Sequence, residues 1–362
     1  MDILLAGYGF YTLGNNNLEG GTILPSLINW SSLSCNNKVN ITCLVRSKDS
    51  FITASKRFRD FFNKNNMDLN LNIVIKKYEE MNKQKKFDCG IISIPEQSHL
   101  DCLKFMVKMT SNIICVKPFT QNTDQYIESL EIAKTENANI FIDFHKRYDE
   151  TNIEFIRQAS LNSNNNGIFN FSYGQKTEMP FLYFKKWAKS SNPFQYLAPH
   201  YLDIIFQILK NKGVKCKNLK ISGTADALKF NNANNLISLI SCNLKLFDDQ
   251  NCFLLNSICN WMEPKMSPFN SRQRIEFQSE SIHLISEQDN RGQMIINDDL
   301  LKIPNPHFMT QDLENNSYGY GVKSFTNFLD YVSGRFPKDK LSSIDDYLPI
   351  AKVIDYVNEL LN

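Results

Sequence analysis

Short apolar runs alternate with amphipathic stretches over the first part of the chain, and this pattern predicts parallel strands joined by helices. Residues 89–94 form an apolar run, residues 96–109 carry spaced apolar positions without proline, and residues 113–116 form a second apolar run. A strand, a helix and a strand in this order make a βαβ unit with parallel strands and a right-handed crossover. Both strands then end at the carboxyl edge of one sheet, where open α/β sheets bind ligands.

The same alternation continues on both sides of this unit. Strands are predicted at 3–6, 41–45, 71–75 and 140–144, and helices at 22–30, 51–62, 123–137 and 152–160. From residue 167 onward the period changes to two, in 168–174 and in parts of 218–230, 236–247, 252–261 and 273–285. Such alternation predicts long strands of a sheet with one face open to solvent or to a partner. Only three later helices are predicted, at 199–209, 321–333 and 344–361.

These elements define the expected fold class, which is α/β. We expect an N-terminal Rossmann domain with a doubly wound parallel sheet and a C-terminal α+β domain with a large, mostly antiparallel open sheet. A chain of 362 residues exceeds the usual single core. We place the dinucleotide-binding domain at 1–122 and the substrate and dimerisation domain at 123–362. Whether the helix at 344–361 packs back on the first domain is left open.

The second sheet has too few helices to cover both of its faces. An uncovered apolar face favours association, so we expect this sheet to pair with a copy of itself in a homodimer or homotetramer.

Composition excludes several other classes of protein. The net charge is +2, and no basic patch indicates nucleic acid or a membrane as a partner. No apolar run approaches the ~20 residues that cross a bilayer, and the strand at the start leaves no room for a signal peptide. The 9 cysteines are odd in number and form no CxxC pair. We therefore expect a cytoplasmic protein with reduced thiols and no metal site.

A glycine-rich turn follows the first predicted strand. Gly7 and Gly9 fill the first two places of a GxGxxG fingerprint, Thr12 stands at the third, and Gly14 comes two residues late, before a long loop to Gly21. In this fingerprint the first glycine makes the tight turn and the second lets the backbone approach a pyrophosphate. A GxG pair also occurs in simple strand-ending turns, but its place at the first strand of an α/β pattern favours dinucleotide binding.

Arg46 and Ser47 follow the second predicted strand, with no acidic residue at that junction. An acid there would bind the ribose of NAD, whereas an arginine accommodates the 2′-phosphate of NADP. The sequence therefore favours NADP over NAD, with a solvated basic turn as the alternative.

Two residues stand out as candidates for chemistry. Lys117 ends a predicted strand, and Pro118 restricts the backbone around it. Pro199 fits the first position of a helix, which places His200 in the first turn, where the helix dipole disfavours imidazolium. A neutral histidine can accept a proton from an alcohol. Asp203, three residues on, either orients the ring or meets solvent.

Together these motifs resemble the Gfo/Idh/MocA family, named after glucose–fructose oxidoreductase, inositol dehydrogenase and a rhizopine catabolism protein. The motifs occur in the family order over nearly the whole chain: Gly7 and Gly9, Ile94-Pro95 with His99, Val116-Lys117-Pro118, Phe144-His145-Lys146-Arg147, and His200-Tyr201-Leu202-Asp203. The resemblance implies hydride transfer between a nicotinamide and a carbinol or ketone carbon of a sugar, cyclitol or sugar nucleotide.

The resemblance also implies roles for individual residues. Lys117 would stabilise negative charge on the reacting oxygen, His200 would be the general acid/base, and Arg147 would shape the substrate side. The expected cofactor contacts are Gly7, Gly9, Phe10, Tyr11, Thr12, Arg46, Ser47, Ile94, Pro95, His99, Lys117 and Pro118. The expected substrate contacts are Arg147, Tyr196, Asp203 and Trp187.

Two positions depart from the family pattern. Val116 replaces a glutamate before the lysine, and Tyr196 replaces the acid four residues before the histidine. These changes support an alternative, a non-catalytic dinucleotide-binding sensor or assembly protein. A third option is a hydrolase or lyase that uses its cofactor as a transient oxidant. The aromatic and basic stretch at 183–194 is either a sugar-stacking or phosphate-contacting lip or a solvated loop.

Overall fold

The computed structural model describes residues 1–14, 21–33, 38–65, 71–82, 84–231, 235–298, 300–312 and 316–362. Their contacts divide the chain into two compact units. Unit 1 comprises Met1–Thr120, Asp124–His145 and Phe308–Asp345, and unit 2 comprises Gln121–Thr123, Lys146–His307 and Asp346–Asn362.

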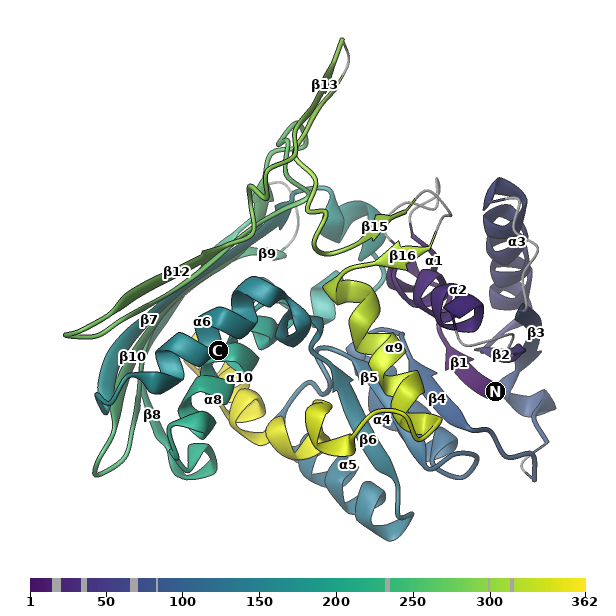
Figure 1. The fold of residues 1–362 in the computed structure, drawn as a ribbon, viewed down its shortest axis with the longest axis horizontal. Helices are drawn as coiled ribbons and strands as arrows, with labels where there is room; N and C mark the ends of the chain where they lie inside the picture. Colours follow the sequence, from purple (N-terminus) through teal and green to yellow (C-terminus); the bar gives the residue numbers. More distant parts are fainter. Residues whose placement is uncertain are drawn as a thin grey trace. The chain divides into compact units, whose positions relative to one another are not determined.

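A six-stranded parallel sheet forms the centre of unit 1 (Figure 1). Its strands are β1 (Asp2–Ala6), β2 (Val39–Val45), β3 (Leu71–Lys77), β4 (Cys89–Ile92), β5 (Asn112–Val116) and β6 (Asn139–Asp143). Their spatial order is β3-β2-β1-β4-β5-β6, so the direction of winding reverses between β1 and β4. Open sheets of this kind bind ligands at that switch point. The predicted doubly wound Rossmann sheet is confirmed.

The helices of unit 1 leave the inner strands of its sheet mostly buried. They are α1 (Phe10–Leu13), α2 (Ile23–Leu33), α3 (Lys48–Asn65), α4 (His99–Met106), α5 (Thr123–Thr135) and α9 (Tyr320–Val332). The four residues of β4 are all buried, as expected for a parallel strand between two helical layers. α9 contacts α2 and adds Phe325, Phe328 and Leu329 to the core of this unit.

The division into units differs from the boundary predicted after residue 122. β6 and most of α5 belong to unit 1, and the chain returns to this unit at residues 308–345. It is α9 that lies in unit 1, whereas the C-terminal helix α10 (Leu348–Leu361) lies in unit 2. Both helices are amphipathic, and an apolar stripe does not say which sheet it covers.

Unit 2 is built on a second six-stranded sheet in the order β12-β11-β7-β10-β9-β8. Its strands are β7 (Asn166–Lys176), β8 (Lys220–Lys229), β9 (Ile237–Phe247), β10 (Cys252–Glu263), β11 (Ser271–Gln278) and β12 (His283–Glu287). Neighbours are antiparallel except β7 and β10, which run parallel. The predicted open, mostly antiparallel sheet is confirmed.

Helices lie on one face of this second sheet, as Figure 1 shows. They are α6 (Glu150–Leu161), α7 (Pro193–Leu197), α8 (Pro199–Asn211) and α10. α6 contacts β12, α7 contacts β9 and β10, and α10 contacts β8 and α8. Along β10 the burial alternates, with Phe253 and Leu255 buried and Leu254 and Ile258 exposed. The alternation arises because one face meets the helices and the other does not.

Short elements complete the two units. Two small hairpins are formed by β13 (Ile295–Asn297) with β14 (Leu300–Lys302) and by β15 (Thr310–Gln311) with β16 (Ser317–Tyr318). Short helical turns lie at Tyr78–Glu80, Glu96–Ser98, His145–Tyr148, Met179–Tyr183, Ala188–Ser190, Cys216–Asn218, Lys338–Lys340 and Ile344–Asp346.

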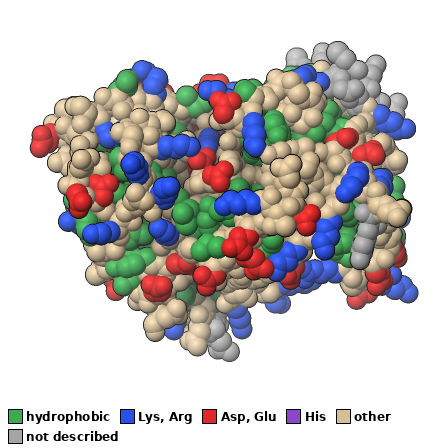
Figure 2. Space-filling view, turned by 90° about the horizontal axis from the view of Figure 1, so that it is seen from below, with side chains coloured by type: hydrophobic (Ala, Val, Ile, Leu, Met, Phe, Trp, Pro, Cys, Tyr) green, Lys and Arg blue, Asp and Glu red, His purple; other side chains and the backbone are tan. Residues whose placement is uncertain are grey.

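The surface gives no sign of a basic interface on the face drawn in Figure 2, where lysine and arginine side chains are interspersed with acidic ones. Within the described ranges, no helix combines the length and apolar character needed to cross a bilayer.

Candidate functional site

The glycine-rich turn after β1 lies against the end of β4. Gly7 has a φ of +117°, and a Cβ at this position would lie 1.9 Å from the carbonyl oxygen of Ser93. Only glycine fits such an approach. Thr12 is buried, and its hydroxyl donates to Ser93 Oγ at 3.2 Å. The turn is therefore fixed to the strand on the far side of the switch point.

Gly9 leaves open space beside this turn. A Cβ built on Gly9 would meet nothing within 4 Å among the described residues. This is the feature that lets a backbone approach a pyrophosphate, so the turn fits a dinucleotide. Phe10 is half-buried beside it. Residues 15–20 of the expected long loop lie outside the described residues, and Gly21 packs against the end of α1, where its Cβ would be 2.5 Å from the carbonyl carbon of Leu13.

Arg46 and Ser47 are both exposed at the end of β2. Ser47 Oγ accepts a hydrogen bond from the backbone N–H of Ser50 at 3.1 Å and so caps the first turn of α3. The guanidinium of Arg46 is the charged group that the sequence assigns to a 2′-phosphate, and the structure leaves it at the surface.

His99 ties together the two strand ends on which the sequence analysis focused. It is 2% exposed, and its Nε2 lies 2.7 Å from the carbonyl oxygen of Ile94, while its Nδ1 lies 3.0 Å from that of Phe119. These carbonyls flank Pro95 on one strand and Lys117-Pro118 on the other. Lys117 is half-buried, and its peptide bond to Pro118 is cis. The ring of His99 thus links the backbone of the two strand ends, and it would support a cofactor site there indirectly.

Burial lowers the pKa of His99, although its bonds to backbone carbonyls oppose this shift. The unfolded chain, with a histidine pKa of about 6.5, takes up a proton before the folded one does. The contribution of neutral His99 to the free energy of unfolding is therefore complete above about pH 6.5. It is lost as the pH falls towards the pKa of the folded state, by at most about 1.4 kcal/mol per pH unit.

We expect the free energy of unfolding, measured with urea at pH 7.5, 6.0 and 5.0, to fall with this slope in the wild type, and His99→Gln to remove the slope. His307→Gln, at an exposed position, is the control, and an equal slope in wild type and His99→Gln would contradict the expectation.

In unit 2, His200 lies where the sequence placed it. α8 begins at Pro199, which puts His200 in the first turn. The imidazole is 1% exposed and stacks on the ring of Tyr173, with centroids 6.5 Å apart and planes at 26°. Burial raises the pKa of Tyr173. An aromatic neighbour of this kind fixes the plane of the histidine ring.

Arg147 and Asp203, both assigned to the substrate, form a buried ion pair with each other. Arg147 Nε donates to Asp203 Oδ2 at 2.7 Å and its Nη2 donates to Oδ1 at 2.5 Å. Asp346 lies 3.3 Å from the same guanidinium. Burial raises the pKa of Asp203, and the adjacent Arg147 opposes that rise. Asp203 is 1% exposed, so the alternative in which it meets solvent is wrong.

Tyr196 and Trp187 belong to an aromatic cluster. Their ring centroids are 5.3 Å apart, and each also contacts Phe184. Trp261 of β10 lies 6.3 Å from both Tyr196 and Phe184. Because Phe184 is buried, the stretch at 183–194 is not a wholly solvated loop. Trp187 and Tyr196 are only half-buried.

Sequence reasoning missed the environment of Lys146. This lysine is 1% exposed, its Nζ donates to the side-chain oxygens of Gln273 and Gln288, and it lies over the rings of Tyr173 and Tyr201 at 5.4 and 5.2 Å. Its position beside Arg147 in a quoted motif was the only signal. A buried lysine cannot be told from an exposed one by its neighbours along the chain.

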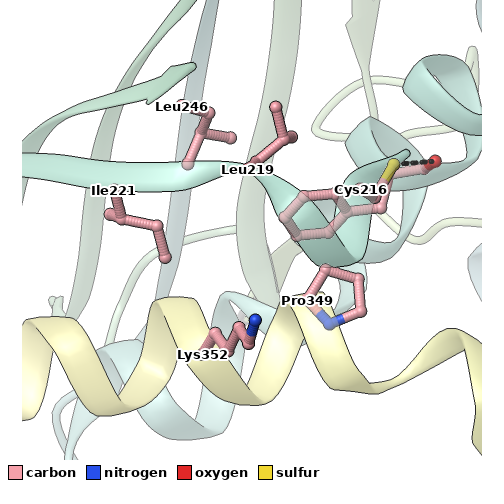
Figure 3. Close-up of a pocket in the computed structure, with 7 residues that line it drawn as sticks. Cys216, Leu219, Ile221, Leu246, Pro349 and Lys352 are labelled. Atoms are coloured by element: carbon pink, nitrogen blue, oxygen red, sulfur yellow. Dashed lines mark hydrogen bonds between the residues drawn. The ribbon is translucent and has the colours of Figure 1, made fainter. Parts of the chain in front are cut away.

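A small pocket in unit 2 contains none of the predicted site residues. Figure 3 shows its lining, which is mostly apolar: Phe206, Cys216, Leu219, Ile221, Leu246, Pro349 and Lys352. It lies against the later part of α8, whereas His200 occupies the first turn. Among the described residues, no group of three or more His, Cys, Asp or Glu is placed to hold a metal ion.

One stretch of the chain matches a family model. Residues 33–144 match the profile of GFO_IDH_MocA, an oxidoreductase family with an NAD-binding Rossmann fold. No curated protein sequence matches the chain.

Solved structures resemble the chain over its whole length. A probable dehydrogenase from Thermotoga maritima has a TM-score of 0.66 at 12% identity, with 100% of this chain and 96% of that chain covered. The scyllo-inositol dehydrogenase of Lactobacillus casei, solved with NAD(H) and scyllo-inositol, has a TM-score of 0.66 at 13% identity, covering 99% and 96%. A myo-inositol dehydrogenase from Corynebacterium glutamicum has a TM-score of 0.64 at 14% identity, covering 99% and 96%. At these identities the likeness concerns the fold, and with the profile match it confirms the resemblance drawn from the sequence motifs.

Proposed function

We propose that this chain, whose residues 33–144 match the model of the Gfo/Idh/MocA oxidoreductase family, is an NAD(P)-dependent dehydrogenase or reductase acting on a CH–OH group or its ketone. The observation that carries the proposal is the turn at Gly7 and Gly9. It is held against β4 by the close approach of Gly7 to Ser93, and among the described residues nothing lies within 4 Å of a Cβ built on Gly9. Such a turn at the switch point of a doubly wound sheet is built for a dinucleotide pyrophosphate.

The substrate we propose is a sugar, a cyclitol or a sugar nucleotide. Support comes from the half-buried rings of Trp187 and Tyr196, since aromatic faces suit the apolar faces of sugar rings. The inositol dehydrogenases among the similar structures favour the same class.

A nicotinamide supplies the hydride chemistry when bound. As the family resemblance implies, we assign to the Lys117 ammonium of unit 1 the stabilisation of negative charge on the reacting oxygen, and to the His200 imidazole of unit 2 the role of general acid/base. Arg147 and Asp203 act on this chemistry through the position of α8, because they are bonded to each other.

We further propose that NADP is preferred over NAD. Arg46 is exposed at the end of β2, and the junction carries no acid that would repel a 2′-phosphate. We place the protein in the cytoplasm, because the eight described cysteines are all free thiols.

One assay tests the proposal. Purified protein is titrated with NADPH and NADH by nucleotide fluorescence and then incubated with a panel of keto-sugars and inosose, following absorbance. We expect NADPH to bind more tightly than NADH and at least one substrate to be reduced. Binding without turnover on any substrate would favour the sensor or assembly role. That role is supported by Val116 and Tyr196, which replace two acidic residues of the family pattern. Product formation without net change in the cofactor would favour the lyase or hydrolase role.

The exposed face of the second sheet supports a homo-oligomer. Large apolar side chains lie exposed on three of its strands: Leu228, Leu254, Ile258, Met262 and Ile285. Three of them, Leu254, Ile258 and Met262, alternate with Asn256 and Asn260 on the outward side of β10, which is an inner strand. Burying this face against a second copy would remove these apolar side chains from water.

We expect light scattering at micromolar concentration to give the mass of a dimer or tetramer, and Leu254→Lys/Ile258→Lys to give a monomer. Charges buried in a sheet-to-sheet interface are unpaired and costly. Ile52→Lys, at an exposed apolar position of α3, is the matched control. A monomeric mass for the wild-type protein would contradict this proposal.

A further inference from the structure

Tyr11, Asp143 and His145 are joined by hydrogen bonds at the carboxyl edge of the sheet in unit 1. The Tyr11 hydroxyl donates to Asp143 Oδ2 at 2.6 Å and lies 3.0 Å from His145 Nδ1. Tyr11 comes from the glycine-rich turn after β1, and Asp143 is the last residue of β6. The cluster therefore ties that turn to a strand three places away in the sheet.

The buried carboxylate of Asp143 needs hydrogen-bond donors. The residue is 1% exposed, and within the described part of the chain its Oδ1 has no hydrogen-bond partner. His145 Nδ1 lies 3.7 Å from Oδ2. Since a buried carboxylate is strongly disfavoured without hydrogen-bond donors, the Tyr11 hydroxyl is essential to it, and the carboxylate in turn fixes that hydroxyl.

The imidazole of His145 is held by aromatic rings as well. It stacks on Tyr320 with centroids 5.7 Å apart, meets Phe308 edge-on at 5.4 Å, and stacks on Tyr11 at 6.2 Å. Tyr11 also contacts Phe325 of α9 at 6.3 Å. The ring of Tyr11 is thus restrained from β6 and from the segment at 308–325, all within unit 1.

The cluster lies next to the strand that carries the proposed chemistry. Asp143 pairs in register with Val116 on the neighbouring strand, and Val116 precedes Lys117. Parallel neighbours in register present their side chains on the same face of the sheet. A change at Asp143 therefore acts both near the strand end of Lys117 and, through Tyr11, on the turn at Gly9.

We propose that Asp143 and His145 are positioning residues that hold Tyr11, and through it the glycine-rich turn, in the conformation that binds the dinucleotide. This inference rests on the proposed function and deepens it, because it names what keeps the cofactor site in order. A turn that is fixed before binding loses less freedom when the ligand arrives, so the cluster raises affinity without a new contact to the ligand.

Tyr11→Phe tests this with the smallest change, since it removes the hydroxyl and keeps the ring. Fluorescence titration with NADPH and NADH should give a Kd about 10- to 100-fold weaker for Tyr11→Phe and for Asp143→Asn, as expected for loss of a hydrogen bond to a charged group. The double variant should bind as weakly as the single ones, because both break the same link. In turnover, KM for the nucleotide should rise while kcat changes less than about threefold.

Tyr331→Phe is the matched control. Its hydroxyl donates to Asn112 Oδ1 at 3.4 Å, at the start of β5 and hence at the opposite edge of the same sheet. We expect its Kd to equal that of wild type. If Asp143→Asn fails to fold, Tyr11→Phe decides the question alone. Wild-type affinity in a folded Tyr11→Phe protein overturns the inference and leaves the proposed function standing, whereas failure of the wild type to bind either nucleotide overturns both.

Discussion

Lys117→Ala is expected to lower kcat for ketone reduction by about 10²- to 10³-fold, with a smaller loss of NADPH affinity, because Lys117 is also an expected cofactor contact. Removing one donor that stabilises a developing oxyanion costs about 2.7–4 kcal/mol of transition-state stabilisation. The loss should appear in kcat because the charge on the oxygen develops only in the transition state. Steady-state kinetics on the best substrate of the panel, together with the nucleotide titration, measure both quantities.

Two further variants make the interpretation of Lys117→Ala specific. Lys117→Arg keeps a positive charge but changes its shape and reach, so we expect partial activity between those of wild type and Lys117→Ala. Lys134→Ala removes an exposed lysine from α5 and should leave kcat unchanged. A Lys117→Ala protein with more than a third of wild-type kcat would show that the oxygen is stabilised by another group.

The strands of unit 1 could be predicted closely from the sequence. β4 and β5 read as apolar runs because both faces of a parallel sheet are covered, and nothing about their partners is needed to see this. Gly7 could be predicted because a turn with positive φ favours glycine locally, whereas its close approach to Ser93 could not. Pro199 likewise marks the helix start that places His200, since its ring fits the first position of a helix.

The pairings that organise the polar residues could not be predicted in this way. Tyr11 meets Asp143, and Arg147 meets Asp203, over separations of 132 and 56 residues. A polar side chain carries no mark in the sequence that distinguishes a buried partner from solvent. The sequence therefore suggested that Arg147 and Asp203 would both face a substrate, whereas the structure shows that they neutralise each other.

Asp203→Asn is expected to destabilise unit 2 by about 3–5 kcal/mol, because it leaves a buried guanidinium without its main partner. The side chain of Arg147 is 13% exposed and that of Asp203 is 1% exposed, so water replaces little of the lost interaction. Asp346, at 3.3 Å from the Arg147 guanidinium, remains as a second carboxylate but is shared with Lys210.

Tryptophan fluorescence can follow unit 2 separately. Of the three tryptophans, Trp30 lies in unit 1 and Trp187 and Trp261 lie in unit 2. Urea unfolding followed by tryptophan fluorescence in a Trp30→Phe background therefore reports on unit 2.

The matched comparison is Arg147→Met/Asp203→Leu, which removes both charges and fills the site with apolar side chains of similar size. Replacing a buried ion pair in this way is often neutral or stabilising, so the double variant should be more stable than Asp203→Asn. Lys210→Ala removes a 62% exposed cation from the same cluster and should cost no more than about 1 kcal/mol. If Asp203→Asn cost as little as Lys210→Ala, the pair would not hold α8 in place, and Arg147 would be available to bind a substrate directly, as its motif first suggested. The loss of unfolding free energy in Asp203→Asn thus decides whether Arg147 has a structural or a substrate-binding role.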